Sequence, residues 1–340
     1  MTRLRTSVGL LAIVYVAAAT AGFLAPYDPA EQNRRYPFAP PVKVHVLDAA
    51  GSIHRRPFVY ELRPRPGTFD EYDEDRERPL EIRFFVRGTP YRLAGVVPST
   101  LHLFGVEGSR RVFLMGTDEY GRDVLSRLLH GAGISLGAGL LAAAAAVSLG
   151  LVIGSIAGYY GGASDMLAMR AAELVMAVPS LYLLLALRAA LPLHLAPADA
   201  FVLLVAVVGA VGWARPALLV RAVVSTVRTR DFVVAARSSG ASDVHILARH
   251  VLPQAAGVAL TQFALLVPQC VLAEVTLSFF GLGVSEPAPS WGTMLADLQR
   301  FHILAAAYWW LFLPAIAIVA VFLLYYSITD ALHQRLMLRS

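Results

Sequence analysis

Long apolar runs separated by polar segments dominate the sequence, and the runs approach the length that a membrane-spanning helix needs. Such a helix requires roughly 20 apolar residues, because its backbone groups must hydrogen-bond within the helix once water is gone. The pattern predicts an all-α polytopic membrane protein with six spans and both chain ends on one side. The predicted spans are residues 8–24, 134–159, 166–191, 200–224, 257–282 and 303–328.

Composition agrees with this pattern and excludes one class of function. The 340 residues are 57% hydrophobic and 16% charged, and the mean hydropathy is +0.59, which is typical of membrane proteins. The net charge of +5 comes from arginine, since Lys43 is the single lysine. A phosphate-binding P-loop needs Gly-Lys-Ser/Thr after a glycine-rich loop, and Lys43 lies in PPVKVH. The chain therefore carries no such nucleotide site.

Arginine distribution predicts the orientation, because positive charge in short loops marks the cytoplasmic side. The loops opposite hold little besides Arg300. Both termini are therefore predicted to be cytoplasmic, and the long segment after the first span, which is exempt from this rule, to be outside. The marking arginines are Arg3, Arg5, Arg221, Arg228, Arg230, Arg237, Arg249, Arg335 and Arg339.

The first run has a second interpretation as a cleavable signal peptide, because a basic start, an apolar run and small residues follow one another. An uncleaved anchor is favoured, since cleavage would leave five spans and an outside N-terminus. Cys270 is the only cysteine, so no disulfide can form within the chain.

The long segment after the first span, which is predicted to lie outside, differs in composition from the rest of the chain. We call it the outer segment. It is rich in proline, arginine and acidic residues, and LEIRFFVRGTPYRL at 80–93 has the partial alternation of short strands. We expect a small β-rich extracytoplasmic insertion; a partly ordered loop is the alternative. The predicted domains are a first transmembrane helix (1–25), the insertion and linker (26–130), the transmembrane core (131–328) and a cytoplasmic tail (329–340).

A polar stretch between two spans, DFVVAARSSGASDVHILARHVLP at 231–253, predicts a pair of short helices. Asp231 can cap the first helix. Gly240 permits a sharp change of direction, and Ser242 can cap the second helix. Pro253 marks the entry to the next span. We refer to residues 231–253 as the coupling segment.

The second helix of the coupling segment offers an apolar stripe, since Val244, Leu247 and Val251 recur at helical spacing. A projecting helix pair with such a stripe is suited to docking in a groove of another protein. The alternative is an amphipathic helix that lies on lipid headgroups.

Four sequence blocks carry a family resemblance. AARSSGASDVHILARHVLP resembles the cytoplasmic signature of ABC-importer permeases, with two alanines, a glycine and a later Leu-Pro. Three further blocks are similar to the C-type permease subunit of dipeptide, oligopeptide and nickel importers. They are GTDEYGRDVLSRLLHGAGISL (116–136), GYYGGASDMLAMR (158–170) and AEVTLSFFGLGVSEPAPSWGTML (273–295).

The chain departs from the family pattern at three places. Val234 stands where the superfamily signature opens with an acidic residue, and Asp231 is a candidate substitute. Gly133 occupies a place where the family often has arginine. The outer segment 26–115 is longer than in compact members, so the resemblance implies nothing about its role.

The resemblance implies a type I ABC-importer permease fold in a bacterial inner membrane. It implies a homologous second permease subunit, two ATP-binding subunits that do the hydrolysis, and an extracytoplasmic solute-binding protein. Di- or oligopeptides are the expected cargo, with nickel complexes, opines or glycosides as alternatives. The coupling segment would rest in a groove of an ATPase, through Asp231, Ala235, Ala236, Gly240, Ser242, Asp243, Val244, Leu247, Val251 and Pro253.

Ionisable residues inside spans are functional candidates by default. Arg170 and Glu173 are one turn apart and can neutralise each other. Glu274 has no cation near it in sequence, so it either meets a charged partner on another helix or lines the passage. Arg215 is expected to face the cytoplasmic half of the pathway or to snorkel.

The sequence contains no convergent set of catalytic or metal-binding residues. His245 and His250 are five apart, which does not stack two imidazoles on one helix face, and no serine lies in a Gly-x-Ser-x-Gly elbow. We therefore predict no enzyme, no cofactor and no metal, and the scattered arginines indicate no nucleic-acid surface. A secondary transporter is the rival function, but inverted repeats with midplane charge are not evident in the sequence.

Overall fold

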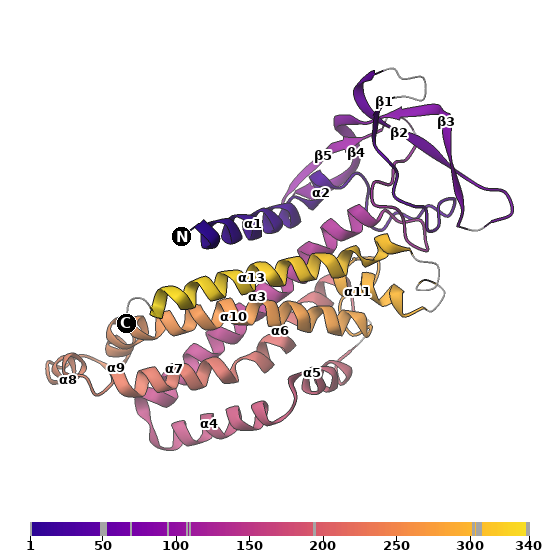
Figure 1. Cartoon of the computed structure of the whole chain (residues 1–340). Coiled ribbons are helices and arrows are strands. Elements are labelled where there is room, and N and C mark those ends of the chain that lie inside the picture. Colours follow the sequence, from indigo (N-terminus) through magenta and orange to yellow (C-terminus); the bar gives the residue numbers. More distant parts are fainter. Residues whose placement is uncertain are drawn as a thin grey trace. The chain divides into compact units, whose positions relative to one another are not determined.

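The computed structural model describes residues 2–47, 53–68, 70–93, 95–106, 108, 110–192, 195–300, 303 and 308–337 (Figure 1). The chain is mostly helical and divides into two compact units, each built from segments that are distant in sequence. Unit 1 comprises Met1–Ser7, Leu136–Gly283 and Phe322–Ser340. Unit 2 comprises Val8–Ser135 and Val284–Val321.

Unit 1 is helical throughout its described elements. Its helices are the start of α1 (Thr2–Ala19), the larger part of α3 (Val124–Tyr160), then α4 (Gly162–Ala177), α5 (Ser180–Ala189), α6 (Pro197–Gly212), α7 (Ala214–Val227), α8 (Asp231–Ser238), α9 (Asp243–Ile246), the π-helical turn η1 (Leu247–Val251), α10 (Leu252–Phe279) and the end of α13 (Leu313–Met337).

Three stretches of helix are long and apolar enough to cross a membrane, namely Val124–Tyr160, Asp243–Phe279 and Trp309–Ala331. Two further pairs of helices pass the same test together but are bent, so the described residues contain three to five candidate spans. The N-terminal helix α1 (Thr2–Ala19) contains a shorter apolar stretch, Leu4–Ala19. The structure therefore supports a polytopic helical protein without fixing six spans.

Two predicted spans are bent rather than straight, and a proline lies at each bend. The prediction of one helix over 166–191 is wrong, because α4 and α5 meet at 93°. Val178 there is extended (ψ 131°) ahead of Pro179, as the proline ring favours. The run 200–224 bends by 46° between α6 and α7. Pro216 cannot donate to the Gly212 carbonyl, and its ring crowds that carbonyl.

Other helix boundaries also differ from the predicted ones. Helix α3 begins at Val124, well before residue 134. The last long helix begins only at Leu313, after a 3₁₀ turn, η3 (Trp309–Phe312); residues 304–307 of the predicted run lie outside the described residues. Helix α13 continues through 329–337 of the predicted tail, while 338–340, with Arg339, lie outside the described residues.

Close backbone contact joins α3 to α7 inside unit 1. Gly150, Gly154 and Gly158 lie four residues apart on one face of α3. A Cβ added at Gly154 would lie 2.4 Å from the Ala217 carbonyl oxygen, and one at Gly158 would lie 2.7 Å from the Arg221 carbonyl oxygen. Small residues at this spacing let membrane helices approach closely.

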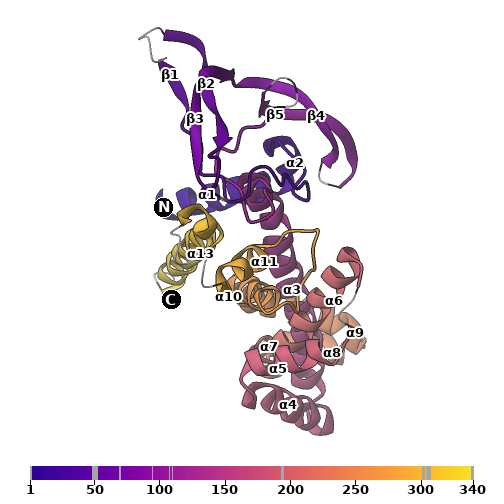
Figure 2. The ribbon, with the colours of Figure 1, turned by 90° about the vertical axis from the view of Figure 1, so that its right-hand side faces the viewer.

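Unit 2 contains two antiparallel sheets in the region where the sequence pattern predicted strands (Figure 2). One sheet has the order β1-β2-β3 and the other is the hairpin β4-β5. The strands are β1 (His45–Leu47), β2 (Ile53–Pro64), β3 (Tyr72–Glu81), β4 (Arg83–Leu93) and β5 (Val97–Gly105).

Two small apolar clusters support the sheets of unit 2. One joins Val59, Leu80, Ile82 and Val112. The other brings Leu62 of β2 against loop residues, with Tyr36, Ala39 and Phe113 as the other buried members. The helices of the unit are α1 from Val8 onward, α2 (Ala21–Leu24), the start of α3, α11 (Trp291–Ala296), the 3₁₀ turns η2 (Asp297–Gln299) and η3, and the start of α13.

Candidate functional site

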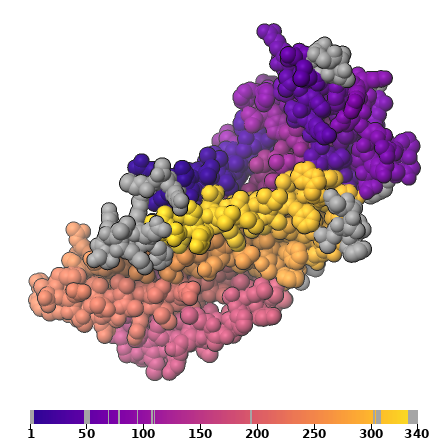
Figure 3. Space-filling model, in the orientation of Figure 1, coloured from indigo at the N-terminus to yellow at the C-terminus, as the bar shows by residue number. Residues whose placement is uncertain are grey.

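The coupling segment forms a bent pair of helices that projects at one end of unit 1 (Figure 1), and the salmon end of the space-filling view shows the same projection (Figure 3). Helix α8 ends at Ser238, and Gly240 follows its C-cap residue, Ser239, with a φ of +85°. The Ala241 amide donates to the Ala236 carbonyl at 3.1 Å and the Gly240 amide to the Arg237 carbonyl at 3.0 Å. This is a Schellman ending, and the predicted turn at Gly240 is confirmed.

The two predicted helix caps have different outcomes. The Ser242 hydroxyl accepts from the His245 amide at 3.4 Å, so Ser242 caps α9 as predicted. Asp231 is not a cap, because α8 starts one residue earlier than the prediction assumed. Its N-cap is Arg230, and the Val233 amide donates to the Arg230 carbonyl at 2.9 Å. Asp231 lies in the first turn of α8, where a carboxylate still interacts favourably with the helix dipole.

One face of the coupling segment is buried against its own chain. Val233 and Ile246 are both fully buried, and Ala236 and Ala241 pack around them. The rest of this buried cluster comes from α3, α7, η1 and the start of α10: Tyr159, Val220, Val224, Val251 and Ala255. The segment is therefore held to unit 1 by a continuous apolar core.

The prediction that Val244, Leu247 and Val251 form one exposed stripe is wrong. Val251 is completely buried, Leu247 packs against the same internal core, and only Val244 is exposed, at 75%. The reason is that α9 continues through the π-helical turn into α10. The stripe consequently faces helices of this chain, and a helical period alone does not say which groove an apolar face fills.

The outward face of the segment carries a different apolar set. Phe232, Val234 and Val244 are 45%, 51% and 75% exposed. Phe232 and Val234 come from α8 and Val244 from α9, on either side of the turn. Ala235, Asp243 and Pro253 are also exposed. These residues form the surface that a partner can reach.

A tyrosine that sequence reasoning missed ties the segment to α3. The Tyr159 hydroxyl donates to Asp243 Oδ1 at 2.6 Å and accepts from Arg237 Nη2 at 2.9 Å. The Arg237 guanidinium also lies over the Tyr159 ring, 5.5 Å from its centroid. Arg228 donates to the Tyr159 carbonyl at 3.1 Å. We call Tyr159, Arg237 and Asp243 the tyrosine lock; it joins both helices of the segment to the end of α3.

A second ion pair fixes α4 to α7 near the same end of unit 1. Arg221 Nε donates to Asp165 Oδ1 at 2.8 Å and its Nη2 to Oδ2 at 2.5 Å. This fork-to-fork geometry is the strong form of the arginine-carboxylate pair. Asp165 belongs to the block at 158–170 that carries the family resemblance, as does Tyr159.

The charged residues within spans lie in three different environments. Arg170 donates to Glu173 at 2.7 Å, so the predicted neutral pair is confirmed; both side chains are exposed. Arg215 is exposed on α7. Glu274 is fully buried in α10 and accepts a hydrogen bond from Ser278 at 2.6 Å.

A charged cluster in unit 2 brings together two of the sequence blocks. Arg122 binds Asp118 at 2.6 Å and Glu286 at 2.9 Å. Arg127 binds Glu286 at 2.8 Å and lies 3.5 Å from Asp118. Asp297 lies 4.0 Å from Arg122. Both arginines are almost completely buried, so the cluster is a structural clasp between the block at 116–136 and the block at 273–295.

The pKa values of the acidic residues in and beside the clasp are shifted in two directions. Burial, followed by the negative charge of Asp118, raises the pKa of Asp297 to about 6. Burial also raises the pKa of the neighbouring Asp123 to about 6, against the hydrogen bonds from Ser126. For Glu286, burial acts in the raising direction, but the bonds and charges of Arg127 and Arg122 prevail and hold its pKa below the usual value.

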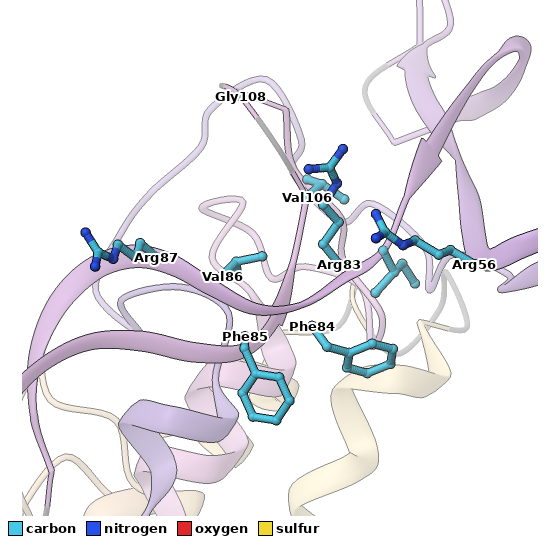
Figure 4. A pocket seen from close by; sticks show the side chains of 9 residues that line it. Arg56, Arg83, Phe84, Phe85, Val86, Arg87, Val106 and Gly108 are labelled. Carbon is cyan, nitrogen blue, oxygen red and sulfur yellow. The ribbon is translucent and has the colours of Figure 1, made fainter.

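The outer sheets of unit 2 carry an open cavity of about 650 Å³ lined by Arg56, Arg83 and Arg87 (Figure 4). Its chemistry is basic, although Arg56 also lies 3.6 Å from Glu81. Among the described residues no group of three or more His, Cys, Asp and Glu side chains is arranged to hold a metal ion.

Comparison with known proteins places the chain in a family of membrane transport components. A family model described as "Binding-protein-dependent transport system inner membrane component" matches residues 150–338, more than half of the chain. The chain therefore belongs to this family, whose members are permease components rather than enzymes. The predicted resemblance to ABC-importer permeases is confirmed.

Individual relatives agree with the family. The oligopeptide transport system permease protein OppC of Bacillus subtilis is 38% identical over 200 residues, which cover 59% of this chain and 63% of that protein. The di/tripeptide transport system permease protein DppC of Pseudomonas aeruginosa is 36% identical over 235 residues, covering 68% and 75%. The dipeptide transport system permease protein DppC of Haemophilus influenzae is 32% identical over 230 residues, covering 68% and 75%.

Proposed function

We propose that this chain is one of two membrane-spanning subunits of an ATP-driven importer for di- or oligopeptides. It would pair with a homologous permease, two ATP-binding subunits and an extracytoplasmic binding protein. Relatives named for oligopeptide, di/tripeptide and dipeptide transport support the cargo class. The family description supports dependence on a binding protein.

The proposal includes six spans with both termini in the cytoplasm. The three long helices and the two bent pairs supply five, and α1 would supply the sixth. Bent helices also occur in secondary transporters, but the family match supports the ABC permease and not that rival.

The observation that carries the mechanism is the construction of the coupling segment. Its inner face is sealed by a buried core, its turn is fixed at Gly240, and its outer face presents Phe232, Val234 and Val244. An exposed apolar patch on a rigid helix pair is the form of a helix-in-groove contact. We place the ATPase contact on these three residues, with Asp231, Ala235 and Asp243 beside them.

Val244→Asp tests the docking role, because it places a charge in the apolar contact without disturbing the core beneath. Truncating a buried interface anchor costs roughly 1 to 4 kcal/mol of association, and a buried unpaired carboxylate costs more. We expect normal membrane levels of the subunit with loss of ATPase co-purification and of peptide uptake.

Two variants control this experiment. Ser239→Ala, on the exposed turn, should leave both measurements nearly unchanged. Leu247→Asp should lower the amount of folded subunit, since Leu247 packs on the internal core. If Val244→Asp kept both ATPase association and uptake, the groove-docking role would be refuted and a lipid-bound helix would explain the segment better.

Orientation is tested separately with cysteines placed at Glu74 and Ser239 in a Cys270→Ala background. A membrane-impermeant thiol reagent should label position 74 in intact spheroplasts and position 239 only after lysis. The reverse labelling would invert the proposed topology.

A further inference from the structure

The two sheets of unit 2 differ in net charge. Residues 53–81, which hold β2 and β3, contain eight acidic residues and six arginines, whereas residues 83–105, which form β4-β5, contain no acidic residue and carry Arg83, Arg87 and Arg92. The hairpin is thus net basic, although it directly follows a sheet that is net acidic.

The hairpin also exposes large apolar side chains. Phe84, Phe85, Val96 and Val97 are 59%, 63%, 77% and 56% exposed. Figure 4 shows both phenylalanines on the side of β4 opposite Arg83 and Val86. The alternation is broken because Phe85 has a φ of +56°, which is strained for an aromatic residue. The strand therefore separates an aromatic side from a basic side.

The hairpin is held firmly at the end of the first apolar helix. Tyr91 lies so close to α2 that a Cβ at Gly22 would be 2.2 Å from its ring. The His102 ring lies between two carbonyl oxygens, with Nδ1 2.6 Å from that of Ala25 and Nε2 3.0 Å from that of Thr89. A segment fixed in this way keeps a constant depth relative to the end of α1.

A cavity of about 430 Å³ opens between the hairpin, α1 and the start of α3. Its walls combine small residues with one arginine and one histidine: Ala18, Ala19, Ala21, Gly22, Gly133, Arg92 and His130. The Arg92 side chain is exposed and has no ion-pair or hydrogen-bond partner among the described residues. The cavity therefore offers an uncompensated cation above an apolar wall.

The length of α3 allows this cavity to lie at a membrane interface. With 37 residues, α3 is about 55 Å long at 1.5 Å per residue, whereas the hydrocarbon core is about 30 Å thick. Helix α3 is thus long enough for its first turns, which carry His130 and Gly133, to lie at headgroup level. Aromatic and arginine side chains are the usual interfacial anchors.

We propose that the β4-β5 hairpin rests on the bilayer surface at the end of α1, with an anionic phospholipid headgroup in this cavity. The lipid phosphate would face Arg92, and an acyl chain would follow Ala18 and Gly133 toward the membrane. Basic residues at a surface attract anionic lipids. The inference depends on the proposed function only in treating α1 as a span.

Depth measurements on the full chain assembled with its partner subunits test the proposal. In a Cys270→Ala background, an environment-sensitive fluorophore is attached at Val96→Cys, at Ile53→Cys or at Ile13→Cys. Ile53 is a matched control, since it is 78% exposed on β2 while Val96 is 77% exposed on the hairpin tip. The complex is reconstituted in phosphatidylcholine and phosphatidylglycerol vesicles that contain lipids spin-labelled near the headgroup or in mid-chain.

Headgroup-level spin labels should quench the fluorophore at position 96 at least threefold more than the one at 53, and mid-chain labels should quench position 13. Equal quenching at 96 and 53, with 13 quenched, would overturn the lipid contact while α1 remained a span. A fluorophore at 13 that is not quenched would overturn the span and the inference together. If the fluorophore at position 96 became shielded from water only after an acidic partner protein was added, the hairpin would be assigned to protein docking instead.

Lipid selectivity tests the cavity itself. Mass spectrometry of the purified complex in mixed micelles should show bound phosphatidylglycerol enriched over phosphatidylcholine, and Arg92→Ala should lower this enrichment about fivefold. Arg55→Ala, which removes an exposed arginine on β2, is the control and should not change it. Unchanged enrichment in Arg92→Ala would overturn the assignment, and displacement of the lipid by inorganic phosphate would reassign the cavity to free phosphate.

Discussion

Different kinds of contact stabilise the interior of each of the two units. In unit 1 the glycine face of α3 meets the backbone of α7, and α4 is joined to α7 by the ion pair of Asp165 with Arg221. In unit 2 the small cores are supplemented by aromatic pairs and by a network of ion pairs, including the clasp of Arg122 and Arg127.

This difference follows from the surroundings expected for the packed helices of unit 1 and for the sheets of unit 2. Lipid tails are as apolar as the side chains of a helix, so helices in a bilayer gain little from burial and depend on close packing. Sheets in water gain from burial of apolar area, and their exposed ion pairs add little stability. Unit 1 should therefore be most sensitive to added volume, and unit 2 to changes in buried charge.

Gly154→Leu should have the largest effect, because a side chain there would strike the Ala217 carbonyl. Overpacking against backbone that cannot move should destabilise unit 1 by more than about 3 kcal/mol. The yield of monodisperse subunit and its thermal midpoint report this loss. Gly257→Leu on α10 is the control, since a Cβ there meets nothing within 4 Å; equal losses in both variants would refute the close-packing account.

Asp297→Asn should have a smaller, pH-dependent effect on unit 2. The pKa of Asp297 is raised from 3.8 to about 6, so the folded chain holds this proton more tightly than the unfolded chain. The tightly held proton contributes its full free energy of stabilisation below pH 3.8, and this contribution is lost as the pH rises through about 6. The variant should gain up to about 3 kcal/mol at pH 7.5 and little at pH 4.

Thermal midpoints at the two pH values measure this gain. Asp73→Asn serves as the control, because its pKa is lowered by the hydrogen bond from Arg65 and its removal should bring no gain at pH 7.5. A gain for Asp297→Asn that is the same at pH 4 and pH 7.5 would contradict the raised pKa.

Tyr159→Phe should have the smallest effect on folding but a measurable one on coupling. It removes the hydroxyl that joins Asp243 and Arg237 and leaves the apolar core in place. Loss of one such interaction is worth about 1 kcal/mol, or about fivefold. The ratio of peptide uptake to ATP hydrolysis in proteoliposomes should fall by about this factor.

Two comparisons sharpen the result for the tyrosine lock. Tyr160→Phe alters an exposed neighbour that has no side-chain hydrogen bond to the described residues and should be silent. The double variant Tyr159→Phe, Asp243→Ala should be no worse than the more severe single variant, since each change removes the hydrogen bond between Tyr159 and Asp243. Full additivity would show that Tyr159 and Asp243 act separately.

The sequence predicted the local features of the fold better than its long-range contacts. Run length and hydropathy located the helices, and Gly240 and Ser242 marked the turn and cap, because these depend on neighbouring residues. The bends were missed although Pro179 and Pro216 were visible, since apolar run length was given more weight than proline chemistry. The glycine spacing on α3 was equally readable as a close-packing motif.

Contacts between distant residues could not be predicted from one chain. Tyr159 and Asp243 are 84 positions apart, and nothing in either neighbourhood identifies the other. The apolar stripe was recognised correctly as a pattern but assigned to an external groove. The structure shows that Val251 fills an internal core instead, because the π-helical turn joins α9 to α10.

The continuous run of helix from Asp243 to Phe279 converts small rotations into large movements. Its 37 residues form a rod about 55 Å long, with Val244 near one end and Glu274 about 45 Å away along the axis. If the rod tilts about Val244 by 10°, Glu274 is carried sideways by about 8 Å. A partner that turns the exposed end by a modest angle can thus displace the far end by more than the diameter of a side chain.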